Sequence, residues 1–201
     1  MYNFKRLILL GDIFEDLDFN RLKKEHWSFL SAIRKLSNPK RNTEVIWVEG
    51  NHDAGLSKIT SHFLGVKVYK EYAFRLNGKK ILTVHGHQFD RFLNENVIIS
   101  NIASYFYDSI QKYGGEKQKL ARWIKGKSKG WLRLAGKIAL SAAEYAAQRG
   151  FNVVICGHTH QPASEYFDEM QIQYFNTGCW TDIPSSYIVI DNEGNAEICH
   201  A

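Results

Sequence analysis

The sequence contains few cysteines and no long apolar run, and each shortage excludes a class of protein. Its three cysteines, Cys156, Cys179 and Cys199, are too few and oddly numbered for a disulfide framework. No run reaches the roughly 18 apolar residues that a membrane-spanning helix needs. The first residues lack the long apolar region and the small-residue cleavage site of a signal peptide. We therefore expect a protein of a reducing, cytoplasmic setting.

What the chain does contain fits one folded domain. Its 201 residues fall below the roughly 250 at which hydrophobic cores divide. A hydrophobic share of 44% and a charged share of 23% exclude a disordered or fibrous chain. There is no internal repeat, low-complexity tract or linker. We predict a single domain over residues 1–201.

Short apolar runs rich in β-branched residues predict strands that are buried on both faces. The four early runs cover residues 6–12, 44–53, 80–87 and 152–160. Residues 68–84 predict a hairpin that turns at Asn77–Gly78, a pair that tolerates positive φ. Later strands are predicted at 171–176 and 185–191.

Helices are predicted at 20–37, where apolar residues recur at near-helical spacing before Pro39, and through 95–150. Strands combined with helices indicate the α/β class. We therefore predict one α/β domain with a helical insertion at about 95–150.

Each of the four early runs ends in residues that can bind a metal ion or contact a phosphate. They are Asp12; Asn51, His52 and Asp53; His85 and His87; and His158 and His160. Because ligand sites in open α/β sheets form beyond the carboxyl ends of strands, we expect these segments to converge. Carboxylate, amide and imidazole ligands together suit Mn²⁺, Fe²⁺ or Zn²⁺. The lack of cysteine at these strand ends argues against a structural zinc site.

Four motifs, taken together, resemble those of the calcineurin-like metallophosphoesterase family. They are Gly11-Asp12, Gly50-Asn51-His52-Asp53, His85-Gly86-His87 and Gly157-His158-Thr159-His160. Residues 10–15, 85–90 and 174–180 further resemble the branch that contains UDP-2,3-diacylglucosamine diphosphatase. The resemblance covers nearly the whole chain. It implies a sandwich of two mixed β-sheets flanked by helices, with a helical cap insertion.

The resemblance also implies a set of metal ligands. Asp12 would bridge two divalent ions, and Asn51, His85 and His158 would complete the shell of the second ion. His160 would belong to the first ion. The expected cofactor is Mn²⁺, with Fe²⁺ or Zn²⁺ as alternatives.

Two further residues receive catalytic roles from the resemblance. His52 would donate a hydrogen bond or a proton to the leaving oxygen, and Asp53 would fix the orientation of His52. The attacking group would be a metal-activated water, so no covalent enzyme nucleophile is expected.

One family motif is not found in the sequence. The family normally carries an Asp-x-His strand end well upstream of its Gly-Asp motif, but none of the eleven residues before Asp12 is aspartate or histidine. Two explanations stay open. In the first, the start is truncated or wrongly assigned, and the intact site holds two ions. In the second, the chain is a variant that holds one ion and has little or no hydrolytic activity.

Residues 117–137 carry eight lysines and arginines and no acidic residue. This local charge exceeds the net +5 of the whole chain, so the remainder is weakly acidic. On a helix, the apolar residues of this stretch form one stripe and most basic residues lie opposite. That pattern is typical of a helix on an anionic membrane surface, and also of an ordinary solvated face.

From this stretch we expect Lys125, Lys129 and Arg133 to bind substrate phosphates, together with peripheral contact at the inner face of a membrane. Nucleic acid ranks lowest as a partner, because no aromatic ladder for base stacking is evident. The oligomeric state stays open.

We therefore predict a metal-dependent hydrolase of phosphodiesters or diphosphates, with a lipid-linked sugar nucleotide as the expected substrate. A broad phosphodiesterase with a soluble substrate is one alternative. The other is a metal-binding scaffold that engages membranes or protein partners without turnover.

Overall fold

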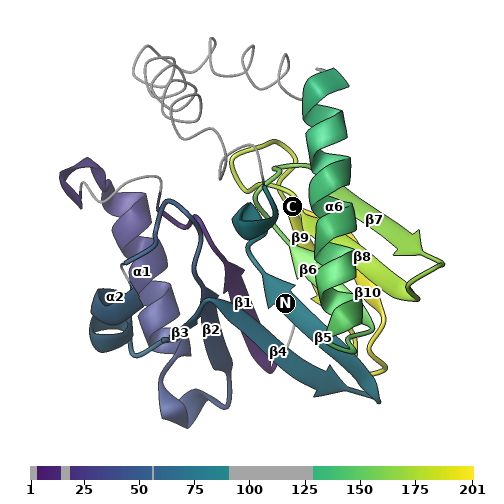
Figure 1. Cartoon of the computed structure of the whole chain (residues 1–201). Coiled ribbons are helices and arrows are strands. Elements are labelled where there is room, and N and C mark those ends of the chain that lie inside the picture. Colours follow the sequence, from purple (N-terminus) through teal and green to yellow (C-terminus); the bar gives the residue numbers. More distant parts are fainter. Residues whose placement is uncertain (1–3, 15–18, 56, 91–128) are drawn as a thin grey trace.

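The computed structural model describes residues 4–14, 19–55, 57–90 and 129–201. This part of the chain contains ten strands in three hydrogen-bonded sheets and three α-helices (Figure 1). The α/β class predicted from the sequence is confirmed. Most of the predicted insertion, residues 95–128, lies outside the described residues.

The smaller layer is a parallel sheet of three strands. In order across the sheet, these are β1 (Arg6–Leu10), β2 (Glu44–Val48) and β3 (Lys67–Tyr69). Parallel neighbours need a crossover connection. Here α1 (Lys24–Leu36) lies between β1 and β2 in the chain, and α2 (Ser57–Leu64) lies between β2 and β3.

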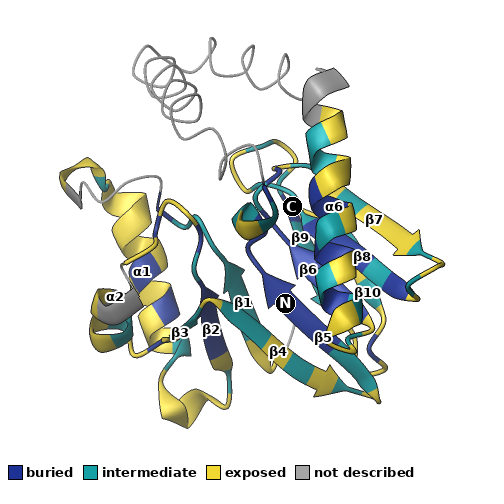
Figure 2. Cartoon of the chain, viewed as in Figure 1, coloured by how far each residue is buried: buried dark blue, intermediate teal, exposed yellow. Residues whose placement is uncertain are grey.

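Burial in this layer follows the position of each strand. α1 packs Leu30 and Ile33 against Trp47 of β2, and most of its other residues are exposed (Figure 2). β2 is the middle strand, and its last four residues are buried. β1 was predicted to be buried on both faces but is only half-buried. Within the described residues it pairs on one side alone, with β2.

The larger layer is a mixed sheet of five strands. In order across the sheet, these are β4 (Glu71–Leu76), β5 (Lys79–Val84), β6 (Val153–Cys156), β8 (Ile172–Thr177) and β7 (Pro162–Phe167). β5, β6 and β8 are parallel, and the outer strands β4 and β7 are antiparallel to their neighbours. The predicted hairpin is confirmed, because β4 turns into β5 at Asn77–Gly78, both with positive φ.

One face of this sheet is covered by α6 (Lys129–Gln148). The helix contacts the sheet through small residues that are fully or almost fully buried: Ala139, Ala142, Ala143 and Ala146. Their methyl groups let the helix backbone approach the sheet closely, so the packing depends on small residues at these positions.

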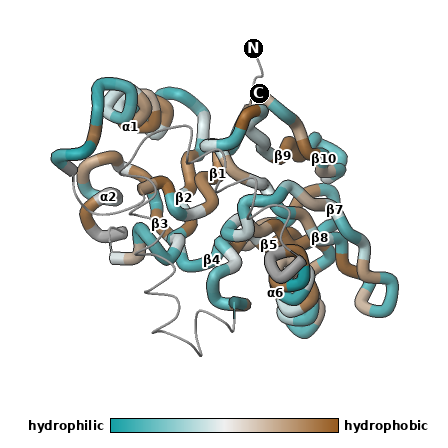
Figure 3. The backbone as a smooth tube through the Cα atoms, turned by 90° about the horizontal axis from the view of Figure 1, so that it is seen from above, coloured by the Kyte–Doolittle hydropathy of each residue, from teal (hydrophilic) through white to brown (hydrophobic). Residues whose placement is uncertain are grey.

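The opposite face is covered by the antiparallel hairpin of β9 (Ser186–Ile190) and β10 (Ala196–His200). Ile188 and Ile198 pack there with Ile81 and Phe175 of the sheet. The view from above shows the resulting order of layers, with α6 first, then β5 and β8, then β9 and β10 (Figure 3).

The resemblance implied two mixed sheets, but hydrogen bonds divide the described strands into three. Leu10, at the end of β1, packs in the same hydrophobic cluster as Ile188 and Ile198. The end of β1 and the β9–β10 hairpin therefore contribute to the packing on one face of the five-stranded sheet, although no strand pairing joins them in the described residues.

Among the described α-helices and strands, α2, β7 and β10 were not predicted, and β3 falls at the start of the segment 68–84 that was predicted as a hairpin. The apolar run at 152–160 is a strand only as far as Cys156, after which the chain enters the loop that carries the histidines. None of the helices in the described part of the chain is long and apolar enough to cross a lipid bilayer.

Candidate metal centre

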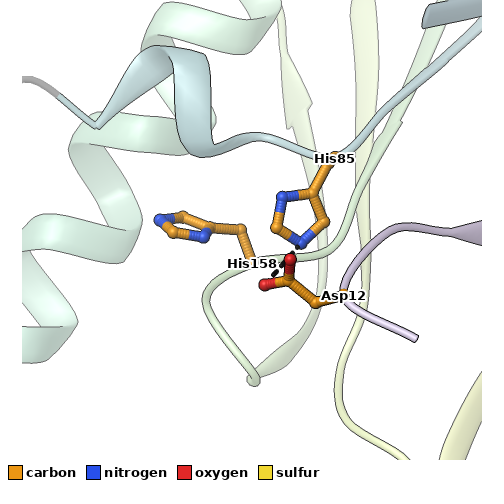
Figure 4. A group of neighbouring side chains, drawn as sticks. All are labelled: Asp12, His85 and His158. Atoms are coloured by element: carbon orange, nitrogen blue, oxygen red, sulfur yellow. Dashed lines mark ion pairs between the residues drawn. The ribbon is translucent and has the colours of Figure 1, made fainter. Parts of the chain in front are cut away.

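Three strand ends bring an acidic residue and two histidines together. Asp12 follows β1, His85 follows β5 and His158 follows β6. Each offers one ligand atom, and these atoms all lie within 4.8 Å of one another. Figure 4 shows the Asp12 carboxylate facing the His85 imidazole, with the His158 imidazole beside them. The predicted convergence of these strand ends is therefore observed.

Strand pairing explains how the three residues meet. β5 and β6 are parallel neighbours, so they end at the same edge of the sheet, and Gly157 N–H donates to the His85 carbonyl at 2.9 Å just beyond that edge. A methyl group added to Gly157 would lie 3.3 Å from the Leu10 carbonyl oxygen, which places the end of β1 against the same loop. Asp12 then reaches His85, with 3.3 Å between Oδ2 and Nε2.

The backbone at this site adopts angles that side chains rarely allow. Asp12, His158 and His160 have φ values of 51°, 66° and 59°. A non-glycine residue in the left-handed region costs energy, and such residues concentrate at functional sites. That three of the predicted ligands share this conformation is an independent sign that this region is a functional site.

The turn after β2 lies against Asp12. His52 N–H donates to Asp12 Oδ1 at 2.9 Å, and the side chains of Asn51 and His52 are exposed on this turn. The structure thus places the backbone of His52, the predicted catalytic histidine, next to Asp12, the predicted carboxylate ligand. His160 is exposed and does not belong to the three-residue ligand cluster found among the described residues.

Asp53 is almost completely buried and ties this turn to the end of β1. Its carboxylate accepts hydrogen bonds from Ile13 N–H at 3.1 Å, from Trp47 Nε1–H at 3.1 Å and from Gly50 N–H at 2.6 Å. Those contacts hold the β2 turn in the position from which His52 reaches Asp12. The catalytic roles of His52 and Asp53 stay predictions.

The electrostatics of the cluster favour the protonation states that bind a cation. Burial acts to raise the pKa of Asp12, but the hydrogen bond and charge of His85 and the N–H of His52 outweigh it and hold that pKa well below its ordinary value. Burial lowers the pKa of His158, although Asp90 opposes the shift. An ionised carboxylate and a neutral imidazole are the metal-binding forms. The donor set therefore fits a borderline divalent ion such as Mn²⁺, Fe²⁺ or Zn²⁺.

Two residues near the cluster received no specific role from the family resemblance, although His87 was among the residues that could bind a metal ion or contact a phosphate. His87 is half-buried, and burial together with the charges of His85 and His158 lowers its pKa to about 4. Asp90 is 2% exposed and lies 3.2 Å from His158 Nε2. Both lie within residues 85–90, one of the stretches that carry the family resemblance. Nothing in the sequence shows that Asp90 contacts His158, which lies 68 positions later.

A cavity of about 470 Å³ opens between α6 and β7, next to the loop that carries His158 and His160. Thr159, between the two histidines of that loop, forms part of its wall. The remaining wall is mixed, with apolar Leu132, Ala135, Pro162 and Ala163 beside polar Gln161 and Glu165.

The predicted substrate-binding residues are described only in part. Lys125 lies outside the described residues, and Lys129 begins α6 with a side chain that is not described. Arg133 is exposed on α6. Their predicted contact with substrate phosphates stays a prediction.

Comparisons with known proteins show which proteins this chain resembles. A family model described as calcineurin-like phosphoesterase matches residues 3–162. The UDP-2,3-diacylglucosamine hydrolase of Blochmanniella pennsylvanica (strain BPEN) is 28% identical over 214 residues, covering 96% of this chain and 82% of that protein. A solved archaeal phosphodiesterase superposes with a TM-score of 0.50 at 16% identity, covering 98% of this chain and 83% of that one. The structural likeness is one of fold.

Proposed function

Because this chain belongs to the calcineurin-like phosphoesterase family, we propose that it hydrolyses a diphosphate or phosphodiester in a lipid-linked sugar nucleotide. Membership makes it a phosphoester hydrolase of a metal-dependent family, as the sequence motifs predicted. The observation that carries the proposal is the convergence of Asp12, His85 and His158 within 4.8 Å at three strand ends.

In the proposed reaction these three residues hold a divalent ion, with Mn²⁺ as the proposed metal. A cation at such a site lowers the pKa of a coordinated water and polarises a phosphoryl oxygen. Asn51 and His52 are exposed on the turn beside Asp12. From there, Asn51 would add an amide oxygen to the site, and the His52 imidazole would donate a proton to the leaving oxygen. Asp53 keeps that turn in place through its three hydrogen bonds.

The lipid part of the proposal rests on two observations. The relative from Blochmanniella pennsylvanica carries a name that specifies a diacylated glucosamine nucleotide. The wall of the cavity beside Thr159 contains apolar residues from α6 and β7 together with Gln161 and Glu165, and an acyl chain would lie against the apolar part. A glucosamine diphosphate bound at the strand ends would then extend its acyl chains between α6 and β7.

The test of hydrolysis uses a generic aryl phosphodiester with added Mn²⁺. We expect turnover in the wild type and its loss in His85→Ala and Asn51→Ala. His200→Ala, which removes an exposed histidine on β10, is the matched control and should retain full activity. Activity that survives His85→Ala would contradict the assignment of the site.

The test of substrate class fills the cavity. Ala135→Phe places a ring in its wall, and Leu140→Phe adds the same ring on α6 away from that wall. Ala135→Phe should slow hydrolysis of a diacylated UDP-glucosamine but not of the aryl diester, and Leu140→Phe should change neither. Equal loss on both substrates would favour a broad phosphodiesterase with a soluble substrate.

Membrane contact through residues 117–137 and a cytoplasmic location stay part of this proposal. Within the described part of that stretch, the basic side chains of Arg133 and Lys137 are exposed. Co-sedimentation with vesicles rich in anionic phospholipid should weaken when the lysines and arginines of 117–137 are replaced by glutamine, and the remaining binding should lose its salt dependence. Unchanged co-sedimentation would exclude this stretch as the contact.

A further inference from the structure

The short helical turn η3 (His87–Phe89) and the residue that follows it contact both histidine ligands. His87, at its start, lies 3.1 Å from His85, measured between the two Nδ1 atoms. Asp90, directly after it, places Oδ2 3.2 Å from His158 Nε2. One continuous segment therefore contacts each ligand histidine through a single ring nitrogen.

The contact with Asp90 bears on which nitrogen of His158 carries the proton. His158 Nε2 and Asp90 Oδ2 lie at hydrogen-bond distance, and an ionised Asp90 carboxylate would accept, so that His158 Nε2 would donate. A neutral imidazole carries one N–H, which leaves the lone pair of His158 Nδ1 free. Asp90 is 2% exposed and the His158 side chain is 8% exposed, so water competes little for this contact.

The contact with His87 acts in the same way on His85. His85 Nε2 faces Asp12, at 3.3 Å, and is the nitrogen nearest the cluster. His85 Nδ1 faces away from Asp12 and toward His87. If His87 Nδ1 accepts the proton of His85 Nδ1, then the Nε2 lone pair of His85 is available to a cation beside Asp12.

We propose that His87 and Asp90 are positioning residues of the metal centre, which hold the protons of His85 Nδ1 and His158 Nε2. The inference rests on the metal site of the proposed function and adds two residues that contact its histidines. His85 would bind through Nε2 and His158 through Nδ1, with the ring of His85 oriented by half-buried His87 and the ring of His158 by buried Asp90. Such partners typically change metal affinity by about 10- to 100-fold.

The first experiment measures metal affinity with variants in matched pairs. His87→Leu and Asp90→Ala remove the acceptors, and we expect each to weaken Zn²⁺ binding by about 10- to 100-fold in competition with a chromogenic chelator. His87→Asn keeps an acceptor oxygen near the position of Nδ1, and Asp90→Asn keeps one acceptor oxygen in its amide. Both variants should therefore lose less Zn²⁺ affinity. His200→Leu controls for removal of an exposed histidine.

The second experiment reads the protons directly and does not depend on activity. Imidazole ¹⁵N shifts of the wild type should show His158 with Nε2–H in the metal-free protein. With the diamagnetic ion Zn²⁺ bound, they should show His85 with Nδ1–H. A simple packing role for His87 and Asp90 predicts no such preference.

The outcomes separate this inference from the proposed function. Zn²⁺ binding that is unaffected by His87→Leu and Asp90→Ala, or the opposite tautomers in the wild type, would overturn the inference. If the imidazole ¹⁵N signals of His87 left the range of free imidazole when Zn²⁺ is added, His87 would be a ligand. That result would also overturn the inference. Tight Zn²⁺ binding with the expected tautomers but no hydrolysis would uphold it and refute the proposed reaction.

Discussion

Gly11 and Gly50 lie so close to the ligand residues that neither position has room for a side chain. A methyl group on Gly11 would overlap the His85 ring and lie 2.9 Å from Gly50 Cα. A methyl group on Gly50 would overlap both the carboxylate and the backbone nitrogen of Asp12. At the scale of single residues, the positions of Asp12 and His85 therefore depend on glycine, which has no Cβ atom, at positions 11 and 50.

Gly50→Ala should displace Asp12 and weaken divalent-metal affinity by about tenfold or more, as loss of a supporting contact does elsewhere. Gly55→Ala is the control, because Gly55 has a positive φ and no atom lies within 4 Å of a methyl group added there. It should cost about 1 to 2 kcal/mol of stability and leave the affinity unchanged. Chelator competition measures the affinity, and urea unfolding measures the stability. Equal affinities in the two variants would contradict the steric account.

The low pKa of His87 predicts how stability depends on pH. The folded protein keeps His87 neutral down to about pH 4, whereas the unfolded chain takes up that proton near pH 6.5. Since the unfolded state binds the proton first as pH falls, the free energy of unfolding of the metal-free protein should decrease between those two values. The lowered pKa of His158 acts in the same direction.

Urea unfolding of the metal-free protein at pH 7, 6 and 5 checks this dependence. His87→Asn removes the titrating group and should make the decrease less steep. A free energy of unfolding that is constant over this range would show that His87 is protonated equally in both states.

At the scale of elements, Gly136 weakens α6 from within, and Gly150 lies just beyond its end. Gly136 lies inside the helix with nothing within 4 Å of an added methyl group. Gly150 follows the helix at φ 69°, where its N–H donates to the Ala147 carbonyl oxygen. These positions should respond to alanine with opposite signs.

Gly136→Ala should stabilise the protein by about 1 kcal/mol, because alanine is the better helix former. Gly150→Ala should destabilise it by about 1 to 2 kcal/mol, because alanine resists the left-handed angle that closes the helix. Thermal unfolding monitored by circular dichroism gives both changes. Destabilisation by Gly136→Ala would show that the first turns of α6 are not helical in solution.

The predictability of each element follows from its burial. β2, β5 and β6 were predictable because each has at least four consecutive buried residues, which appear in the sequence as apolar runs. β7 begins at Pro162 and is mostly exposed, so its sequence gives no comparable pattern.

The residues of the candidate site also divide into those that the sequence predicts and those that it does not. Asp12, His85 and His158 could be found because each follows a glycine or a strand end in a motif. The part played by Asp90 could not, because it depends on burial and on a contact across 68 positions that only the folded chain creates.

At the scale of the whole molecule, the ligand cluster predicts the metal content. Among the described residues, Asp12, His85 and His158 form a single candidate site, so we expect one tightly bound divalent ion per 201-residue chain. At a free ion concentration of 100 times Kd, binding should add about 2.7 kcal/mol to the free energy of unfolding. Elemental analysis after gel filtration gives the stoichiometry, and unfolding with and without a chelator gives the stabilisation. Two ions at full occupancy would require further ligands, of which exposed His160 is the first candidate.

The origin of the ligands in two different sheets has a consequence for folding kinetics. Asp12 extends from the parallel sheet, whereas His85 and His158 extend from the five-stranded sheet. An intermediate in which either sheet has formed alone cannot assemble the three ligands. In a refolding experiment, high-affinity metal capture should therefore coincide with the final docking of the sheets and lag behind the recovery of secondary structure.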